Sequence, residues 1–329
     1  MIRPRFAFPL ALVLSMFSFG SDRAEAQLVP GTGVLMNFDD FEDAAWGFTF
    51  NYPKSSKEED EQIRYPLGQS SNQKWFESPK RGIPDVVKRV ETPPGGLSGS
   101  TGAMYLRTRD TGIPGRPGTV KQAQDDIILT GQSLTLNYSP STVVRVYLPE
   151  WDQWERRNGV TFGYRMGLQG PMEKPAKDRF GKLLRRSPKM VTEIEPYYPG
   201  FFIQFNPKET AQNGKDHAML LIRANENGHE IPGPVITEPG WWTLGMSVTP
   251  DARVHYYAKA GVEDLTAKDL IVSTKPYNIP GTHFNTIFFN VVTPDDGKSW
   301  STPWIIDDPK VFYVNTQQTA TRPAQPTTR

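Results

Sequence analysis

The chain contains no cysteine among its 329 residues. This absence excludes disulfides and any lipid anchor carried on a cysteine, so the fold has to rely on its hydrophobic core. Histidine is scarce too, with 4 residues. Because Cys and His are the usual zinc ligands, a zinc site is not expected. Beyond residue 26, no apolar run approaches the roughly 18 residues of a membrane-spanning helix.

The sequence also lacks an excess of charge of either sign. Its 37 Lys and Arg residues balance 36 Asp and Glu, for a net charge of +1. Nucleic-acid binding draws much of its affinity from a basic field, so we do not expect nucleic acid as a partner. Long helices are not expected either, because 30 Pro and 28 Gly are dispersed along the chain.

The first 26 residues have the features of a secretory signal peptide. Met1–Arg5 is basic, Phe6–Gly20 is apolar, and Ala24–Ala26 has the small-x-small pattern of a cleavage site. We therefore expect cleavage after Ala26 and a secreted or periplasmic bacterial protein. Residues 315–329 consist mainly of Thr, Gln, Pro and Ala, a composition that predicts a disordered tail.

Apolar and polar residues alternate along many short segments, as they do in half-buried antiparallel strands. The clearest are 241–248 and 253–259, joined by a predicted turn at 250–252. Further segments of this kind are 34–38, 46–50, 103–107, 127–136, 143–148, 161–166, 201–206, 218–224, 284–292 and 304–314. Together they predict an all-β fold for residues 27–314, a two-sheet antiparallel β-sandwich of the jelly-roll type.

Three segments resemble known sandwich proteins. Trp242 through Tyr257 resembles the concanavalin A-like lectin and laminin-G superfamily, in which a Trp opens an alternating strand and the next strand ends in an aromatic pair, although Ala252 stands where Gly is usual. Residues 37–46 and 306–311 resemble the first and last strands of carbohydrate-binding jelly rolls. The resemblance implies a concanavalin A-like sandwich with a glycan partner.

A candidate glycan surface follows if the central strands lie in one sheet. Their polar sides would then combine fork-shaped hydrogen-bond donors with aromatic rings, which suits sugar hydroxyls, carboxylates and C–H faces. The residues are Arg145, Tyr147, Arg165, Gln204, His255, Tyr257, Lys259 and Asn290. An ordinary solvated sheet face explains the same residues about equally well. Loops carrying Trp75, Trp151 and Trp154 are the other possible location, although a plug at the sandwich end is the simpler role for Trp151 and Trp154.

Catalysis is the alternative. Residues 257–262 resemble a segment of alginate-lyase-type jelly rolls in which the Tyr is the catalytic acid. In a lyase, Arg165, Gln204, His255 and Tyr257 would have to neutralise the uronate carboxylate and supply the acid and base of β-elimination. The partner motifs of that family are missing, so the leading hypothesis is a non-catalytic carbohydrate-binding or surface-interaction protein. A polysaccharide lyase is the first alternative and a structural envelope protein the second.

Three further segments have simpler interpretations. Glu193 and Glu195 have the spacing of a glycosidase pair but lack a third acid, so we interpret them as a solvated strand edge. Glu42 and Asp307 are candidate ligands of a structural Ca²⁺ that joins the first strand to the last, with capped turns as the alternative. The basic run at 174–189 is predicted to be a solvated loop, with an anionic polysaccharide or the cell envelope as its possible partner.

Overall fold

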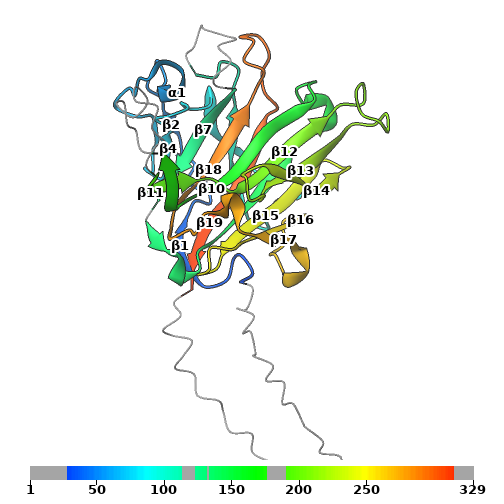
Figure 1. Ribbon diagram of the computed structural model, residues 1–329. Coiled ribbons are helices and arrows are strands. Elements are labelled where there is room, and N and C mark those ends of the chain that lie inside the picture. The colour runs from blue at the N-terminus through cyan, green and yellow to red at the C-terminus, as the bar shows by residue number, and fades with distance from the viewer. Residues whose placement is uncertain (1–27, 113–122, 132, 176–189, 315–329) are drawn as a thin grey trace, which may run out of the picture.

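The computed structural model describes residues 28–112, 123–131, 133–175 and 190–314, which form two antiparallel β-sheets packed face to face (Figure 1). The predicted two-sheet, all-β sandwich is confirmed. The predicted signal peptide, the predicted tail and residues 176–189 of the basic run lie outside the described residues. No helix within the described ranges is long and apolar enough to cross a membrane.

The smaller sheet has the strand order β17-β16-β15-β9-β19-β6-β5, and β1 pairs with β19 beside this path. Its members are β1 (Val34–Phe38), β5 (Val86–Glu91), β6 (Gly102–Arg107), β9 (Ser141–Leu148), β15 (Gly240–Val248), β16 (Val254–Ala260), β17 (Leu270–Thr274) and β19 (Trp304–Tyr313). Because β1 pairs with β19, the two ends of the described chain lie together.

The larger sheet has the order β14-β13-β12-β10-β18-β7-β4-β3-β2, with β11 paired to β10 and β8 to β18. Its members are β2 (Phe48–Thr49), β3 (Gln69–Ser70), β4 (Trp75–Glu77), β7 (Gln124–Leu129), β8 (Leu134–Thr135), β10 (Gly159–Pro175), β11 (Met190–Tyr197), β12 (Gly200–Asn206), β13 (His217–Arg223), β14 (Glu230–Ile236) and β18 (His283–Val292). Short helices complete the described fold: α1 (Lys57–Asp60), η1 (Leu136–Tyr138), η2 (Trp151–Gln153), η3 (Ala267–Asp269) and η4 (Pro276–Asn278).

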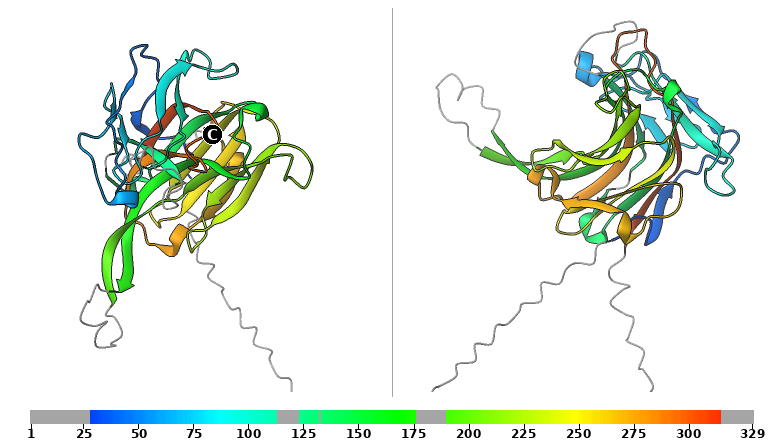
Figure 2. Two further views of the ribbon diagram at one scale, coloured as in Figure 1. Left: turned by 90° about the horizontal axis from the view of Figure 1, so that it is seen from above. Right: turned by 90° about the vertical axis from the view of Figure 1, so that its right-hand side faces the viewer.

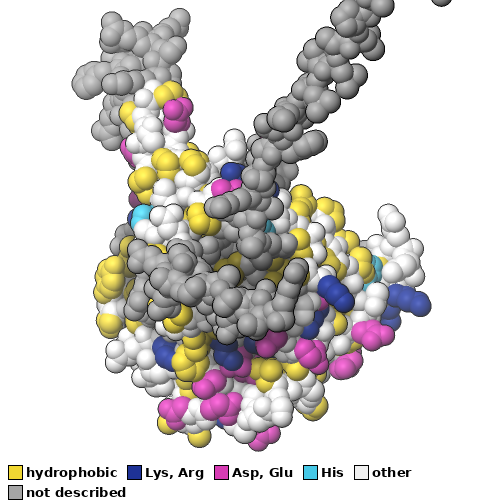
Figure 3. Space-filling view, turned by 90° about the horizontal axis from the view of Figure 1, so that it is seen from below, with side chains coloured by type: hydrophobic (Ala, Val, Ile, Leu, Met, Phe, Trp, Pro, Cys, Tyr) yellow, Lys and Arg dark blue, Asp and Glu magenta, His cyan; other side chains and the backbone are white. Residues whose placement is uncertain are grey.

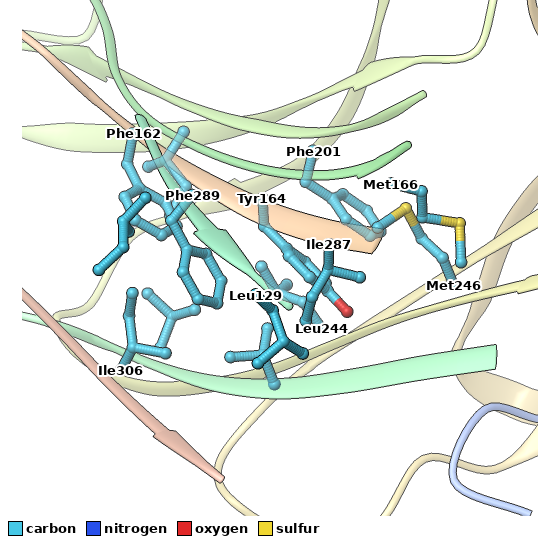
Figure 4. Packing of buried hydrophobic residues seen from close by; sticks show 14 of the residues in the cluster. Leu129, Phe162, Tyr164, Met166, Phe201, Leu244, Met246, Ile287, Phe289 and Ile306 are labelled. Carbon is cyan, nitrogen blue, oxygen red and sulfur yellow. The ribbon is translucent and has the colours of Figure 1, made fainter. Parts of the chain in front are cut away.

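The hydrophobic core lies between the sheets, where alternate residues of each strand point inward (Figure 4). Aromatic rings connect the two layers. Phe162 on β10 lies 4.7 Å from Trp304 on β19 and 5.9 Å from Phe289 on β18, measured between ring centroids. Trp154 is 3% exposed and packs 5.2 Å from Trp304, so its predicted role as a plug at the sandwich end is confirmed.

The β15–β16 hairpin has the predicted turn. Val248 pairs with Val254, and Ala252 in the turn has φ 64°, in the left-handed region that favours glycine. Gly would adopt this conformation more readily than the Ala present here. On β16, Val254 and Tyr256 are fully buried in the main core.

The segment 53–85 is a long excursion that packs beside β7 (Figure 1). Trp75 anchors this segment: it is fully buried, its ring lies 5.5 Å from that of Phe289, and its indole N–H donates to Asp39. Burial of this indole holds the excursion against the larger sheet, where it forms one wall of the site described below.

The β10–β11 hairpin extends from the body of the sandwich as an arm (Figure 2). Glu193 and Glu195 on this arm both pair with Lys174 across the two strands. They therefore form the solvated strand edge that the sequence predicted, and not a pair of carboxylates facing a substrate.

Candidate functional site

A cleft of about 760 Å³ lies on the outer face of the larger sheet, the face turned away from the core. Strands β7, β10, β13 and β18 form its floor. The excursion 53–85 forms one wall, and two loops contribute tyrosines. The lining residues are Lys57, Glu58, Ile63, Ser78, Pro79, Lys80, Arg81, Asp126, Ile128, Arg165, Tyr198, Arg223, Tyr277, Thr286 and Phe288. Five of them are cationic and two are acidic.

Strand register aligns the floor residues in one row across five strands. Arg223 pairs with Gly200, Gly200 with Arg165, Arg165 with Phe288, and Phe288 with Ile128. Gly200 is required in the middle of this row, because a β-carbon there would lie 2.7 Å from Cγ of Arg165. Because Gly200 has no side chain, the Arg165 side chain can lie across it.

Arg165 is the central cation of the cleft and is 5% exposed. Its guanidinium lies over the rings of Tyr198, Phe202 and Phe288, at 5.3, 5.4 and 5.2 Å from their centroids. Among the described residues, no carboxylate forms a salt bridge with it. Burial, with the neighbouring Arg223, lowers the pKa of Arg165 to about 10. The attraction of Asp126 opposes this shift only in part. A buried cation without a salt-bridge partner is costly, which favours an anion as the group that completes this site.

Several other charged groups of the cleft have partners. Arg81 pairs with Glu58, and Arg223 with Glu230. Asp126 is buried, and its Oδ1 accepts hydrogen bonds from Asn290 at 2.6 Å and from Gln124 at 2.7 Å. Burial raises the pKa of Asp126. Arg165 is therefore the cation best placed to meet a ligand carboxylate.

Two tyrosines border the same guanidinium. The Tyr198 ring packs edge-on against Phe288, with centroids 5.5 Å apart. Tyr277 has φ 61°, its N–H donates to the carbonyl of Asn225, and its ring fills space that a β-carbon at Gly228 would overlap. Left-handed backbone at a non-glycine residue is often found at binding sites. Burial raises the pKa of Tyr198, so its hydroxyl is neutral at ordinary pH.

The predicted glycan surface is divided between two sheets, so the premise of one shared sheet is wrong. Arg165, Gln204 and Asn290 belong to the larger sheet, on β10, β12 and β18. Arg165 lines the cleft, Asn290 supports Asp126, and Gln204 donates to Asn206 along its own strand. The other five residues, Arg145, Tyr147, His255, Tyr257 and Lys259, are on β9 and β16 of the smaller sheet.

The outer face of the smaller sheet is covered where β16 lies. Tyr257 is 0% exposed, packs against Val29 and Leu265, and its hydroxyl donates to the carbonyl of Leu28. His255 is buried beside Ser273. The chain at 28–30 and at 262–266 thus forms a cover that strand periodicity alone did not reveal.

The remaining residues of the smaller sheet are engaged by the same cover or by neighbours. Arg145 Nη2 lies 2.7 Å from Asp264 Oδ1, and Lys259 Nζ donates to the carbonyl of Asp264. Tyr147 packs against Trp241 at 5.3 Å between centroids. The alternative lyase set has the same problem: Arg165 and Gln204 lie on one outer face and His255 and Tyr257 on the other, so the four cannot meet one substrate.

Sequence reasoning missed most of the cleft. The sequence Tyr198-Pro-Gly between two strands indicates a turn at Tyr198. The segments that contain Arg81 and Tyr277 show no regular alternation of apolar and polar residues. Arg223 and Phe288 alternate correctly on their strands but could not be placed beside Arg165 without the sheet order.

The calcium candidates lie near each other beside the first and last strands. Asp307 is buried, its Oδ2 accepts from Ser100 at 2.9 Å, and its Oδ1 has no hydrogen-bond partner among the described residues. Burial, with Glu42 and Asp308 nearby, raises the pKa of Asp307 to about 6. Glu42 already accepts N–H and O–H bonds from Thr101. These oxygens fit a cation in part, although the described residues include no group of three or more His, Cys, Asp or Glu arranged to hold a metal.

The surface seen from below mixes acidic and basic side chains among apolar ones (Figure 3). This mixture agrees with the net charge of +1.

No protein-family model matches this chain. No curated protein sequence matches it either. Similar solved structures include an endo-1,3-β-glucanase from Streptomyces sioyaensis, 10% identical, with 88% of this chain and 99% of that chain covered and a TM-score of 0.38. An endo-β-1,4-glucuronan lyase from the fungus Trichoderma reesei is 11% identical, with 86% and 96% covered and a TM-score of 0.36. An alginate lyase in complex with alginate tetrasaccharide is 8% identical, with 65% and 82% covered and a TM-score of 0.37.

These three solved structures are of carbohydrate-active enzymes. TM-scores this low carry no functional inference, so what this chain binds has to be inferred from its own residues.

Proposed function

We propose that this protein binds an anionic polysaccharide, a uronate-containing polymer, in the cleft of the larger sheet. The observation that carries the proposal is Arg165, a buried guanidinium in the cleft that lies over three rings, has a pKa lowered to about 10, and forms no salt bridge among the described residues. A planar guanidinium binds a carboxylate in bidentate fashion, and Tyr198 and Tyr277 supply ring faces for the sugar. The predicted export of the chain would place it where such polymers occur.

A non-catalytic binder fits the cleft better than a lyase. Beta-elimination needs a group that neutralises the carboxylate, a base at C5 and an acid at the leaving oxygen. Arg165 could neutralise the carboxylate. Tyr198 and Tyr277 are the nearest candidates for the base and the acid. Burial raises the pKa of Tyr198, so the deprotonated form that could act as a base is rare at neutral pH. Lyase activity is therefore the second candidate, supported by the position of both tyrosines beside Arg165.

Titration of the purified protein with a soluble polyuronate and with a neutral glucan tests the proposal. We expect saturable binding of the polyuronate that weakens with salt, and no binding by the Arg165→Met variant. Lys259→Gln, a charge-removing change on the opposite sheet, is the matched control and should bind like the wild type. Equal binding by Arg165→Met and the wild type would rule out this cleft as the site.

An absorbance assay for unsaturated uronates, run on the same samples, separates the alternatives. Binding without new absorbance supports a binding protein, and new absorbance that Arg165→Met abolishes supports a lyase at the same site. If several uronate polymers give neither binding nor new absorbance, a structural envelope protein is favoured.

A further inference from the structure

Lys54 is a fully buried lysine held between two carboxylates. Its Nζ lies 2.7 Å from Oδ2 of Asp125 and 2.8 Å from Oδ1 of Asp85. The side chain of Asp125 is fully buried as well, whereas that of Asp85 is 16% exposed. Lys54 comes from the excursion 53–85 and Asp125 from β7, so the pair joins segments 71 residues apart in sequence.

We propose that Lys54 and Asp125 form an intramolecular isopeptide bond, an amide between Nζ of Lys54 and Cγ of Asp125, with Asp85 as the proton-transfer group. The carboxyl carbon is one C–O bond beyond Oδ2, so Nζ lies within about 4 Å of it. This is close to the roughly 3–3.5 Å of a near-attack geometry. The fold holds Nζ of Lys54 and the carboxyl carbon of Asp125 close together. This proximity takes the place of the chemical activation that a carboxyl group needs to form an amide in water.

Hydrogen bonds orient the Asp125 carboxyl group for attack. Thr108 Oγ1 donates to Oδ2 at 2.6 Å, and the N–H of Gly112 donates to Oδ1 at 3.3 Å. These donors stabilise the negative charge that develops on oxygen in a tetrahedral intermediate. The Lys54 stem lies against Gly82, where a β-carbon would be 3.0 Å from Lys54 Cδ, so the ammonium group has little room to move away.

Protonation states favour the electrophile more than the nucleophile. Against the effect of burial, Asp125 and Asp85 raise the pKa of Lys54, so its free amine forms only when a carboxylate takes the proton. Burial raises the pKa of Asp125 to about 7, although the nearby Lys54 opposes this shift. Asp85 accepts N–H bonds from Arg109 at 2.8 Å and Asp110 at 2.9 Å, and its pKa is lowered, chiefly by Lys54, against the effect of burial. Near neutral pH, the cluster therefore exists for part of the time with Lys54 as an ammonium, Asp85 as a carboxylate and Asp125 as a carboxylic acid.

The reaction is a condensation and needs no oxidant or cofactor. The Asp85 carboxylate takes a proton from the Lys54 ammonium, and the free Nζ attacks Cγ of the protonated Asp125. The Cγ–OH bond then breaks, and the hydroxyl leaves with a second proton from nitrogen as water. One proton remains on Asp85, whose partial exposure lets it pass to solvent. The products are the amide and one water molecule.

The bond would supply a covalent tie that this chain cannot obtain from disulfides, because it has no cysteine. Lys54 is three residues before Lys57, which lines the cleft. A cross-link from Lys54 to β7 would therefore fix the wall formed by the excursion relative to the cleft floor. The proposal does not depend on what the cleft binds.

Mass spectrometry of the intact, denatured protein tests the bond. We expect the wild type to be one water molecule lighter than its sequence mass, and a protease digest to contain a branched peptide joining Lys54 to Asp125. Lys54→Arg should have its full sequence mass. Asp125→Asn and Asp125→Ala form a matched pair: the amide of Asn can still react, with loss of ammonia, whereas Ala cannot. Asp85→Asn should leave the chain unlinked.

Wild-type protein that keeps its full mass after prolonged incubation in the folded state, with normal cleavage after Lys54, would overturn the proposal. The wild-type digest decides the question even if every variant fails to fold. A mass deficit that persists in Lys54→Arg would also overturn it, because the lost water would then come from another site.

Discussion

Nε and Nη2 of Arg165 both donate to the same acceptor, the carbonyl oxygen of Tyr198, at 3.2 Å each. Tyr198 lies in the loop between β11 and β12, and its ring also packs against the guanidinium. One residue therefore fixes both the plane and the direction of the side chain. Pre-organisation of this kind reduces the entropy lost when a ligand binds.

Replacement of Arg165 should separate stability from binding. Arg165→Met keeps most of the volume and removes a buried charge that has no salt-bridge partner among the described residues. We expect a free energy of unfolding equal to or above that of the wild type, together with lost polyuronate binding. Urea unfolding and ligand titration of one preparation measure both. A loss of stability of several kcal/mol would show that Arg165 is a structural residue.

Tyr257 should matter for folding as much as Tyr256 does. Both side chains are fully buried, Tyr256 in the main core and Tyr257 under the chain at 28–30. We expect each change to Ala to cost about 3–5 kcal/mol, as other large-to-small core changes do. Lys259→Ala is the neighbouring control and should stay within about 0.5 kcal/mol of the wild type. A Tyr257→Ala variant of wild-type stability would mean that the cover over β16 does not form.

His255 should make folding stability depend on pH. Burial lowers its pKa from the ordinary 6.5, with Asp251 opposing and Arg253 reinforcing the shift. The unfolded chain then binds the proton more readily than the folded protein, so this residue reduces stability as the pH falls through 6.5. The difference in unfolding free energy between wild type and His255→Gln should change by at most about 1.4 kcal/mol per pH unit, between pH 7 and 5. A constant difference across that range would show that His255 is not the titrating group.

We propose that Ca²⁺ binds at Glu42 and Asp307, with carbonyl groups near Asn37 or Asp39 as further ligands. A bound ion stabilises the folded state by mass action. The wild type should therefore melt at a higher temperature in excess calcium than in chelator, and Asp307→Asn should show no such difference. If the wild type has the same melting temperature in excess calcium and in chelator, the proposed calcium site is wrong.

Most strands and the two-sheet sandwich could be predicted from the sequence because alternation along a strand is a local property. The pairing of strands is not local. Arg165 and His255 both point away from the core, yet they lie on different sheets, and periodicity carries no information about which sheet holds a strand. Tyr257 was expected at the surface because the chain that covers it, around Val29, precedes it by more than two hundred residues.

The cleft itself depends on segments that lack regular patterns. Arg81 reaches the site from the excursion 53–85, and Tyr277 from a short helical turn with left-handed backbone. Neither position has a hydrophobic period that would indicate its direction. Of the cleft residues, only Arg165 is indicated as a ligand-binding candidate by the sequence, because it lies on a strongly alternating strand.

The most direct test of the central claim compares one polyuronate with the same polymer after chemical reduction of its carboxyl groups to neutral alcohols. Chain length and backbone stay the same, so a difference in affinity reports the carboxylate alone. We predict that the wild type binds the polyuronate and loses most of that affinity for the reduced polymer, whereas Arg165→Met binds both equally weakly. Equal, tight binding of both polymers by the wild type would contradict a carboxylate held by Arg165.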